Sequence, residues 1–154
     1  SGIQGSKNDL TYRDTYIENL QWACDQFERN NIDLLIEPIN QRNIPKYFLS
    51  STDLAIEIIN KVDRDNINLL FDIYHHQIFR GDVSKYLEKI FPYIGHIQIA
   101  GIPDRNEPNF GELNYDFIFK KLEQLNYDSW VGCEYNPKFN TVSGLKWREE
   151  FNII

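Results

Sequence analysis

Four short apolar runs recur along the chain, and each ends in an acidic or amide side chain. The first run is Leu34–Ile36, followed at once by Glu37 and Pro38. Runs of this length and unbroken apolar character are typical of strands buried on both faces. Pro38 lacks a backbone donor and keeps the preceding residue extended, so we expect the strand to end at Glu37. The other three runs end at Asp72, Gln98 and Glu134.

Helical periodicity fills the stretches between these runs. Apolar residues three and four positions apart predict helices over about 11–29, 51–61, 82–90 and 115–125, and a short one near 145–151. Phe117 is expected on the apolar core face of the helix over 115–125. Strands are expected at about 33–37, 67–72, 94–99 and 130–134. Ser51 or Thr52 is suited to cap the second helix, and Asp82 the third. Strict alternation of strand and helix indicates a parallel sheet covered by helices.

The polar strand ends predict both the fold and the position of the site. In parallel α/β folds, ligands bind at the carboxyl ends of the strands, where all four polar groups are expected. No glycine-rich phosphate loop follows any strand, which favours a (β/α)₈ TIM-type barrel over a doubly wound sheet. Such a barrel needs eight strands. We therefore expect residues 1–154 to form one domain, the C-terminal part of a longer barrel that here lacks its first strands. Its open sheet edges would be covered by another chain or by self-association.

The amino-acid composition argues against some kinds of binding partner. The chain has 154 residues, of which 42% are apolar and 25% charged, as in ordinary globular domains. Sixteen basic against 23 acidic residues give a net charge of −7, which argues against nucleic acid or an anionic membrane surface. The two cysteines, Cys24 in an expected helix and Cys133 in an expected buried strand, have no metal-binding spacing and are expected to be buried free thiols. With no apolar run near the ~20 residues of a membrane span and no signal-peptide pattern, we expect a cytoplasmic protein.

Glu37, Asp72, Gln98 and Glu134 are the candidate metal ligands. Three carboxylates brought together repel one another and raise their pKa values unless a cation neutralises them. A set of carboxylate and amide oxygens suits Mg²⁺ or Mn²⁺, while Zn²⁺ is possible but more often takes His or Cys. The alternative is structural: each acid caps a helix or pairs with an arginine.

Three histidines lie near these strand ends. His75 and His76 follow Asp72 in what we expect to be a loop, and His75 is the better candidate for substrate binding. His96 shares a strand face with Gln98, because side chains two residues apart point the same way. His96 is therefore either a substrate-binding residue or a hydrogen-bonded residue of the core.

The polar loop 101–112 follows the strand that carries Gln98. Its Arg105 is suited to bind a substrate carboxylate through two hydrogen bonds. The alternative is a surface arginine paired with Asp104 or Glu107. We also assign Glu107 to the candidate substrate-binding residues.

Five strings of residues resemble one family. They are Leu35-Ile-Glu-Pro-Ile-Asn40, Phe71-Asp-Ile-Tyr-His75, Gly95-His-Ile-Gln-Ile-Ala100, Arg105-Asn-Glu-Pro108 and Val131-Gly-Cys-Glu-Tyr135. Together they resemble the hydroxypyruvate isomerases of the xylose isomerase-like barrel group, over about residues 10–147.

The resemblance implies a (β/α)₈ barrel that binds a divalent metal through Glu37, Asp72, Gln98 and Glu134, with Glu37 and Glu134 as the proton-transferring pair. The implied reaction interconverts hydroxypyruvate and tartronate semialdehyde through an enediolate, which the metal stabilises. Two features depart from the family or its relatives. The family's first three strands have no counterpart here, and related sugar epimerases usually have histidine where this chain has Gln98. The latter favours the isomerase branch, in which 2-oxo-tetronate isomerases share the pattern.

Two alternatives to an isomerase fit the same type of barrel. A phosphodiesterase like the apurinic-site endonucleases shares this barrel, but it would need a histidine-rich multi-zinc centre and a basic groove. The chain has three histidines and a charge of −7. A barrel fragment that folds and associates without catalysing a reaction is the other alternative, because strands are missing.

Overall fold

A parallel four-stranded sheet organises the chain. The computed structural model describes residues 2–4 and 9–151. Its strands are β1 (Leu34–Ile36), β2 (Ile67–Asp72), β3 (Ile94–Ile99) and β4 (Val131–Cys133), paired in the order β1-β2-β3-β4. All three pairings are parallel, as the alternating pattern predicts.

One helix precedes the first strand, and the others connect the strands or follow the last one. They are α1 (Asp9–Glu28), α2 (Thr52–Val62), α3 (Ile73–Phe79), α4 (Val83–Ile90), the 3₁₀ turn η1 (Phe91–Tyr93), α5 (Tyr115–Gln124), α6 (Thr141–Gly144) and α7 (Trp147–Glu150). Ser51 caps α2, since its Oγ accepts a hydrogen bond from the Leu54 N–H at 3.2 Å. Asp82 precedes α4 as expected, but its side chain makes no capping hydrogen bond.

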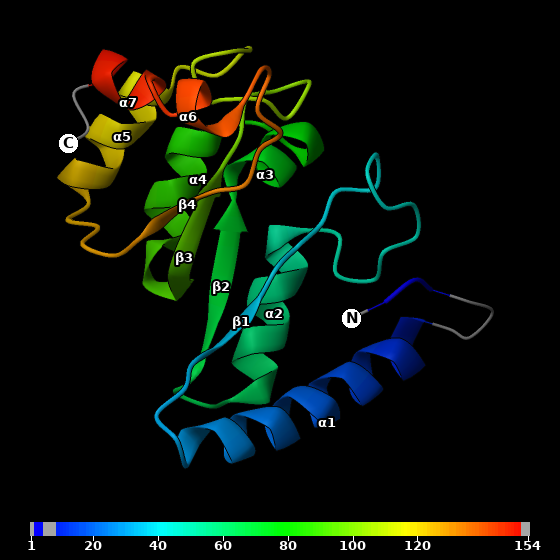
Figure 1. Ribbon diagram of the computed structural model, residues 1–154. Helices are drawn as coiled ribbons and strands as arrows, with labels where there is room; N and C mark the ends of the chain where they lie inside the picture. Colours follow the sequence, from blue (N-terminus) through cyan, green and yellow to red (C-terminus); the bar gives the residue numbers. More distant parts are fainter. Residues whose placement is uncertain (1, 5–8, 152–154) are drawn as a thin grey trace.

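The core lies between the sheet and the helices on one side of it (Figure 1). Alternate strand residues are buried on this side: Leu69 and Phe71 of β2, and Ile97 and Ile99 of β3. They share one apolar cluster with Ile58 and Ile59 of α2. The period of two along β2 and β3 then directs Leu70, His96 and Gln98 to the opposite face, where all three are partly exposed.

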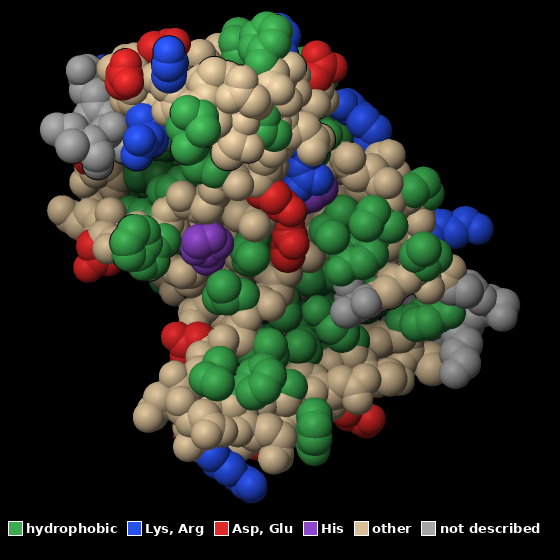
Figure 2. All heavy atoms as spheres, in the orientation of Figure 1, with side chains coloured by type: hydrophobic (Ala, Val, Ile, Leu, Met, Phe, Trp, Pro, Cys, Tyr) green, Lys and Arg blue, Asp and Glu red, His purple; other side chains and the backbone are tan. Residues whose placement is uncertain are grey.

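The opposite face of the sheet is open. On it, Leu35 of β1 is 36% exposed. At the edge of the sheet, Trp130, just before β4, is 83% exposed. Figure 2 shows acidic side chains beside a basic one near the middle of the molecule, with hydrophobic side chains exposed around them. In a closed barrel this face would be the packed interior, so the sheet is an incomplete barrel of the expected type.

Gly95 of β3 lies so close to β2 that a larger side chain would not fit there. The pairing of these strands shifts register between Leu69 and Leu70. A Cβ added at Gly95 would lie 2.7 Å from the Asn68 Cβ and 2.7 Å from the Leu35 Cδ2. Only glycine therefore fits at this point of the open face without displacing its neighbours.

Three expectations were wrong. Residues 73–79 form the helix α3 rather than a loop, so His75 and His76 are buried helical residues, 4% and 3% exposed. Phe117, expected on the core face of α5, is 54% exposed. Cys133, expected in a buried strand, is exposed, since it lies on β4, which is the edge strand of the sheet formed by the described residues. Both cysteines are free, as expected.

Candidate metal and substrate site

Asp72 ends β2 and begins α3 at once. Its Oδ1 accepts a hydrogen bond from the Tyr74 N–H at 2.8 Å, which makes it the N-cap of the helix. The second oxygen, Oδ2, points to the candidate site. The residue is 3% exposed. Asp72 is thus the last residue of β2 and the N-cap of α3, and its Oδ2 takes no part in the cap.

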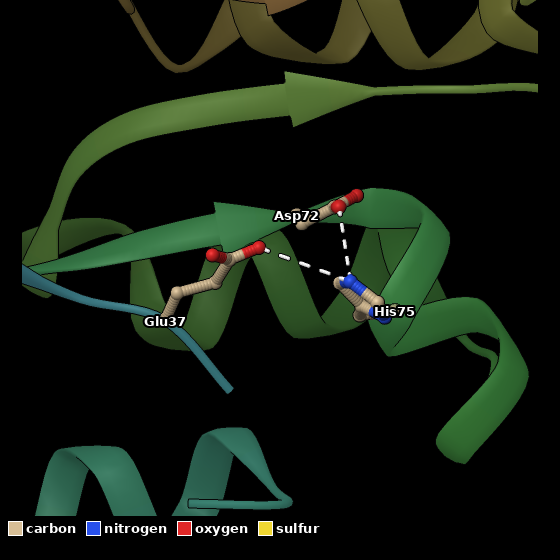
Figure 3. A group of neighbouring side chains, drawn as sticks. All are labelled: Glu37, Asp72 and His75. Carbon is tan, nitrogen blue, oxygen red and sulfur yellow. Dashed lines mark ion pairs between the residues drawn. The ribbon is translucent and has the colours of Figure 1, made fainter. Parts of the chain in front are cut away.

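His75 meets two carboxylates one helical turn later. Its Nε2 lies 3.6 Å from Asp72 Oδ2 and 3.9 Å from Glu37 Oε1 (Figure 3). These three side chains offer ligand atoms within 4.8 Å of one another. The helix α3 therefore delivers His75 to the end of β1, where Glu37, expected as the last residue of the strand, directly follows it.

The tautomer of His75 follows from Asn40. The Asn40 Nδ2 lies 2.6 Å from His75 Nδ1, and the Asn40 Oδ1 accepts from the Asn43 N–H at 2.9 Å. Because this second bond fixes the amide orientation, Asn40 donates to Nδ1 and the ring proton sits on Nε2. Burial lowers the pKa of His75 to about 4, so the ring is neutral. His75 then donates from Nε2 and suits a substrate oxygen better than a metal.

Gln98 lies beside Asp72 with an unsatisfied oxygen. The two residues are register partners on β3 and β2. The Gln98 Oε1 is buried and has no hydrogen-bond partner among the described residues. A buried carbonyl oxygen without a partner costs about 1–3 kcal/mol, unless a ligand satisfies it. This orphaned oxygen is the local evidence that the residues fit a cation.

Glu134 follows β4 and pairs with Arg105. The Arg105 Nη2 lies 2.7 Å from Glu134 Oε2 and 3.3 Å from Asp72 Oδ2. The guanidinium also lies over the Tyr74 ring, 4.8 Å from its centroid. Arg105 therefore pairs with the two proposed ligands rather than with Asp104 or Glu107, the partners considered from the sequence.

The charge of this cluster suits a divalent cation. Burial, followed by the charges of Asp72 and Glu134, raises the pKa of Glu37 to about 7. Burial also raises the pKa of Asp72 to about 6, against the hydrogen bond from Tyr74. Three carboxylates facing one guanidinium leave two negative charges uncompensated when all three ionise. The ligand atoms that lie within 4.8 Å of one another are those of Glu37, Asp72 and His75, and Glu134 joins this group through its ion pair with Arg105. A divalent ion would balance the excess negative charge.

The other two candidate residues lie in different surroundings. His96 packs against β4, where a Cβ added at Gly132 would lie 2.7 Å from its Nε2. Glu107 is 2% exposed, and its two oxygens accept from the Lys138 N–H at 3.0 and 3.2 Å. Its carboxylate also packs against Gly144. Glu107 thus joins the loop 101–110 to the segment after β4, and it contacts backbone where substrate contact was expected.

Sequence reasoning missed two contributors, Asn40 and Tyr74. Asn40 is 2% exposed and fixes His75, and Tyr74 supports the guanidinium of Arg105. Both belong to the strings that suggested the family, but neither carries an ionisable group that marks a site at neutral pH. A polar amide two residues after Pro38 was the one available signal.

The sheet and its polar edge define an incomplete α/β barrel with a candidate cation and substrate site at the carboxyl ends of its strands. The chain belongs to the xylose isomerase-like TIM barrel family, whose model matches residues 1–151.

Similar proteins include two enzymes and one solved structure. A 2-oxo-tetronate isomerase of Cupriavidus necator is 45% identical over 139 residues, which are 90% of this chain and 54% of that protein. The hydroxypyruvate isomerase of Escherichia coli is 42% identical over 137 residues, or 89% of this chain and 53% of that protein. A crystal structure of an AP endonuclease, family 2, from Brucella melitensis is 42% identical with a TM-score of 0.94, covering 97% of this chain and 58% of that chain. The chain therefore spans about half the length of the relatives it matches.

Within the described residues, no helix combines the length and the apolar character needed to cross a membrane.

Proposed function

We propose that the intact protein is a metal-dependent aldose–ketose isomerase that interconverts hydroxypyruvate and tartronate semialdehyde. The observation that carries the proposal is the convergence of Glu37, Asp72 and His75, whose ligand atoms lie within 4.8 Å of one another at the carboxyl ends of β1 and β2. A carboxylate in such a site can accept a proton from a bound substrate and return it. The similarity to isomerases of this substrate class supports the same reaction type.

A divalent cation would be held by Glu37, Asp72, Gln98 and Glu134. Mg²⁺ or Mn²⁺ is preferred to Zn²⁺, because all four donors are oxygens once the protonated Nε2 of His75 is set aside. When bound, such an ion supplies positive charge that stabilises a developing substrate oxyanion.

The chain's own groups would move the proton. Glu37 or Glu134 removes a proton from C3 of hydroxypyruvate, leaving an enediolate, and the same or the other glutamate returns a proton to C2. The O3 proton passes to O2, so the product is an isomer and no oxidant is needed. His75 donates from Nε2 to a substrate oxygen, and Arg105 binds the substrate carboxylate.

A four-carbon substrate is the second candidate. The relative from Cupriavidus necator carries the name 2-oxo-tetronate isomerase, at 45% identity. Both substrates carry a carboxylate beside a carbonyl or hydroxyl group, which Arg105 and the proposed cation would bind alike. Comparing kcat/KM on the two substrates separates these candidates, because an extra hydroxymethyl contact changes kcat/KM by roughly tenfold or more.

Two further readings have less support. A phosphodiesterase acting on nucleic acid would need a basic surface, whereas the chain carries a net charge of −7. A fragment that associates without catalysis would expose the same open face and edges. We propose that this open face is covered in the intact protein, by the remainder of the barrel or by a second copy of the chain. Light scattering after gel filtration distinguishes these two arrangements by mass.

Exchange of substrate hydrogen with solvent tests the proposal. In D₂O the intact protein should incorporate deuterium at C3 of hydroxypyruvate, as followed by proton NMR. Glu37→Gln and Glu134→Gln should each slow this exchange by at least about 100-fold, the usual contribution of a positioned acid–base group. Glu149→Gln, at an exposed position on α7, is the matched control and should exchange normally. Normal exchange in both site variants would refute the assigned roles.

A further inference from the structure

One nitrogen of Arg105 bridges two of the proposed metal ligands. Its Nη2 lies 3.3 Å from Asp72 Oδ2 and 2.7 Å from Glu134 Oε2. These carboxylates come from β2 and from the residue after β4, which are not neighbours in the sheet. The guanidinium therefore lies between two ligands that a shared cation would also have to contact.

The oxygen that Arg105 uses is the one a cation would need. Asp72 Oδ1 already accepts from the Tyr74 N–H at 2.8 Å, as the cap of α3. Only Oδ2 remains for the site, and it faces both Arg105 and His75. A hard cation binds carboxylate oxygen at roughly 2.0–2.6 Å, well inside the present Arg105 contact. The guanidinium and the cation therefore compete for the same oxygen.

The backbone of Arg105 is fixed, so release must come from its side chain. The residue has a left-handed backbone with φ of 57°, its N–H donates to Gly101 O at 2.8 Å, and its carbonyl accepts from the Asn136 N–H at 2.7 Å. The guanidinium rests over the flat face of Tyr74. Its side chain is 23% exposed. Rotation of the side chain can therefore carry the charge away while the loop stays in place.

We propose that Arg105 is an internal counter-cation of the metal site: it links Asp72 and Glu134 before a divalent ion binds, and the incoming ion releases its guanidinium to take the substrate carboxylate. This inference rests on the proposed function for the metal and the substrate. It orders the two binding events, because the guanidinium is available to the substrate only after the ion has replaced it. Arg105 thereby couples binding of the metal ion to binding of the substrate.

The direction in which Arg105→Gln changes the affinity for Mn²⁺ distinguishes this coupling from a role in which Arg105 only holds the metal ligands in position. If Arg105 competes with the ion, Arg105→Gln removes the competitor and should bind Mn²⁺ more tightly. An adjacent opposite charge shifts the proton affinity of a carboxylate by roughly 1–3 pKa units, so we expect an increase of at least about tenfold. If Arg105 only held the ligands in position, the same variant would bind Mn²⁺ more weakly.

Calorimetric titration with Mn²⁺ alone, on the intact protein, makes this comparison. Arg64→Gln is the matched control, since Arg64 also pairs with a carboxylate at 2.7 Å, that of Asp25, at an exposed position. The control should bind Mn²⁺ as the natural protein does. Equal or weaker binding by Arg105→Gln overturns the inference while leaving the metal site standing. Absence of Mn²⁺ binding in the natural protein overturns both the metal site and the inference.

A measurement on the natural protein tests release directly. The Nε–H resonance of Arg105, assigned by its loss in Arg105→Gln, reports the hydrogen bond from Nε to Glu134 O at 3.3 Å. Diamagnetic Mg²⁺ should shift this resonance, with saturation at the concentration that fills the site. A resonance that does not move while Mg²⁺ binds would show that the guanidinium stays in place, and the inference would fail.

Discussion

Glu37→Gln should change how the stability of the metal-free protein depends on pH. Burial raises the pKa of Glu37 from its usual 4.5 to about 7. The folded protein thus holds this proton more tightly than the unfolded chain does. Its contribution to stability is fully present below pH 4.5 and is lost as the pH rises to about 7. Glutamine keeps the shape but cannot ionise, so the variant does not lose this contribution.

The expected difference follows from the size of the shift. A displacement from 4.5 to about 7 corresponds to at most about 3 kcal/mol of unfolding free energy, at 1.36 kcal/mol per unit. Because 27% of the side chain is exposed, solvent screening reduces this, and we expect about 2 kcal/mol. The buried neutral rings of His75 and His76 act oppositely, since their pKa values are lowered to about 4. Their contribution is present above pH 6.5 and is lost toward pH 4 in both proteins, so it cancels in the difference.

Urea unfolding with EDTA at pH 5 and pH 8, followed by tryptophan fluorescence, measures this difference. Trp147 is buried and reports loss of the core. Glu37→Gln should match the natural protein closely at pH 5 and exceed it by about 2 kcal/mol at pH 8. Glu149→Gln should show no such change with pH. An equal gap between Glu37→Gln and the natural protein at both pH values would show that Glu37 does not carry this pH dependence.

Three further substitutions test individual contacts. Gln98→Leu should leave the unfolding free energy of the metal-free protein unchanged or raise it by about 1 kcal/mol. In calorimetry it should weaken Mn²⁺ binding at least about tenfold, and an unchanged Mn²⁺ affinity would contradict a ligand role for the unpaired Gln98 oxygen. Gly132→Ala should lower the unfolding free energy measured in urea by about 1–3 kcal/mol, because the new Cβ would lie 2.7 Å from His96 Nε2. A variant as stable as the natural protein would show that the His96 side chain moves aside without cost. Asn40→Ala should lower the unfolding free energy by about 1–3 kcal/mol, because His75 Nδ1 loses its hydrogen-bond partner. It should also change the NMR chemical shifts of the His75 ring nitrogens, and unchanged shifts would contradict the assigned tautomer.

The central strands could be predicted to the residue, and the end strands less closely. β2 and β3 have the expected bounds, because each is a six-residue run paired on both sides. β1 and β4 each pair on one side only and are shorter than expected, at three residues. Apolar pattern alone does not reveal how many neighbours a strand has.

The helix α3 could not be predicted from the pattern. It is seven residues long and starts directly after a strand, without a connecting loop. Its N-cap is Asp72, which the sequence marks as a metal ligand, so the capping signal was hidden by the functional one. This double use explains why His75 and His76 were expected in a loop and are instead buried in the helix.

The position of the candidate ligands at the carboxyl edge of the sheet could be predicted, because it depends only on the strands being parallel. The partners of Arg105 could not, because they depend on a left-handed residue in a loop and on a carboxylate 29 positions away. Glu107 shows the same limit: its hydrogen bonds go to the backbone of Lys138, which no residue-type pattern indicates.

Turnover on hydroxypyruvate, measured with and without a divalent ion, is the decisive test of a metal-dependent isomerase. The intact protein, stripped with EDTA and dialysed, should form no tartronate semialdehyde, and Mg²⁺ or Mn²⁺ should restore turnover as the site fills. Full turnover in the presence of EDTA would contradict the metal-dependent mechanism. Absence of turnover in a protein that binds the ion would contradict the proposed reaction.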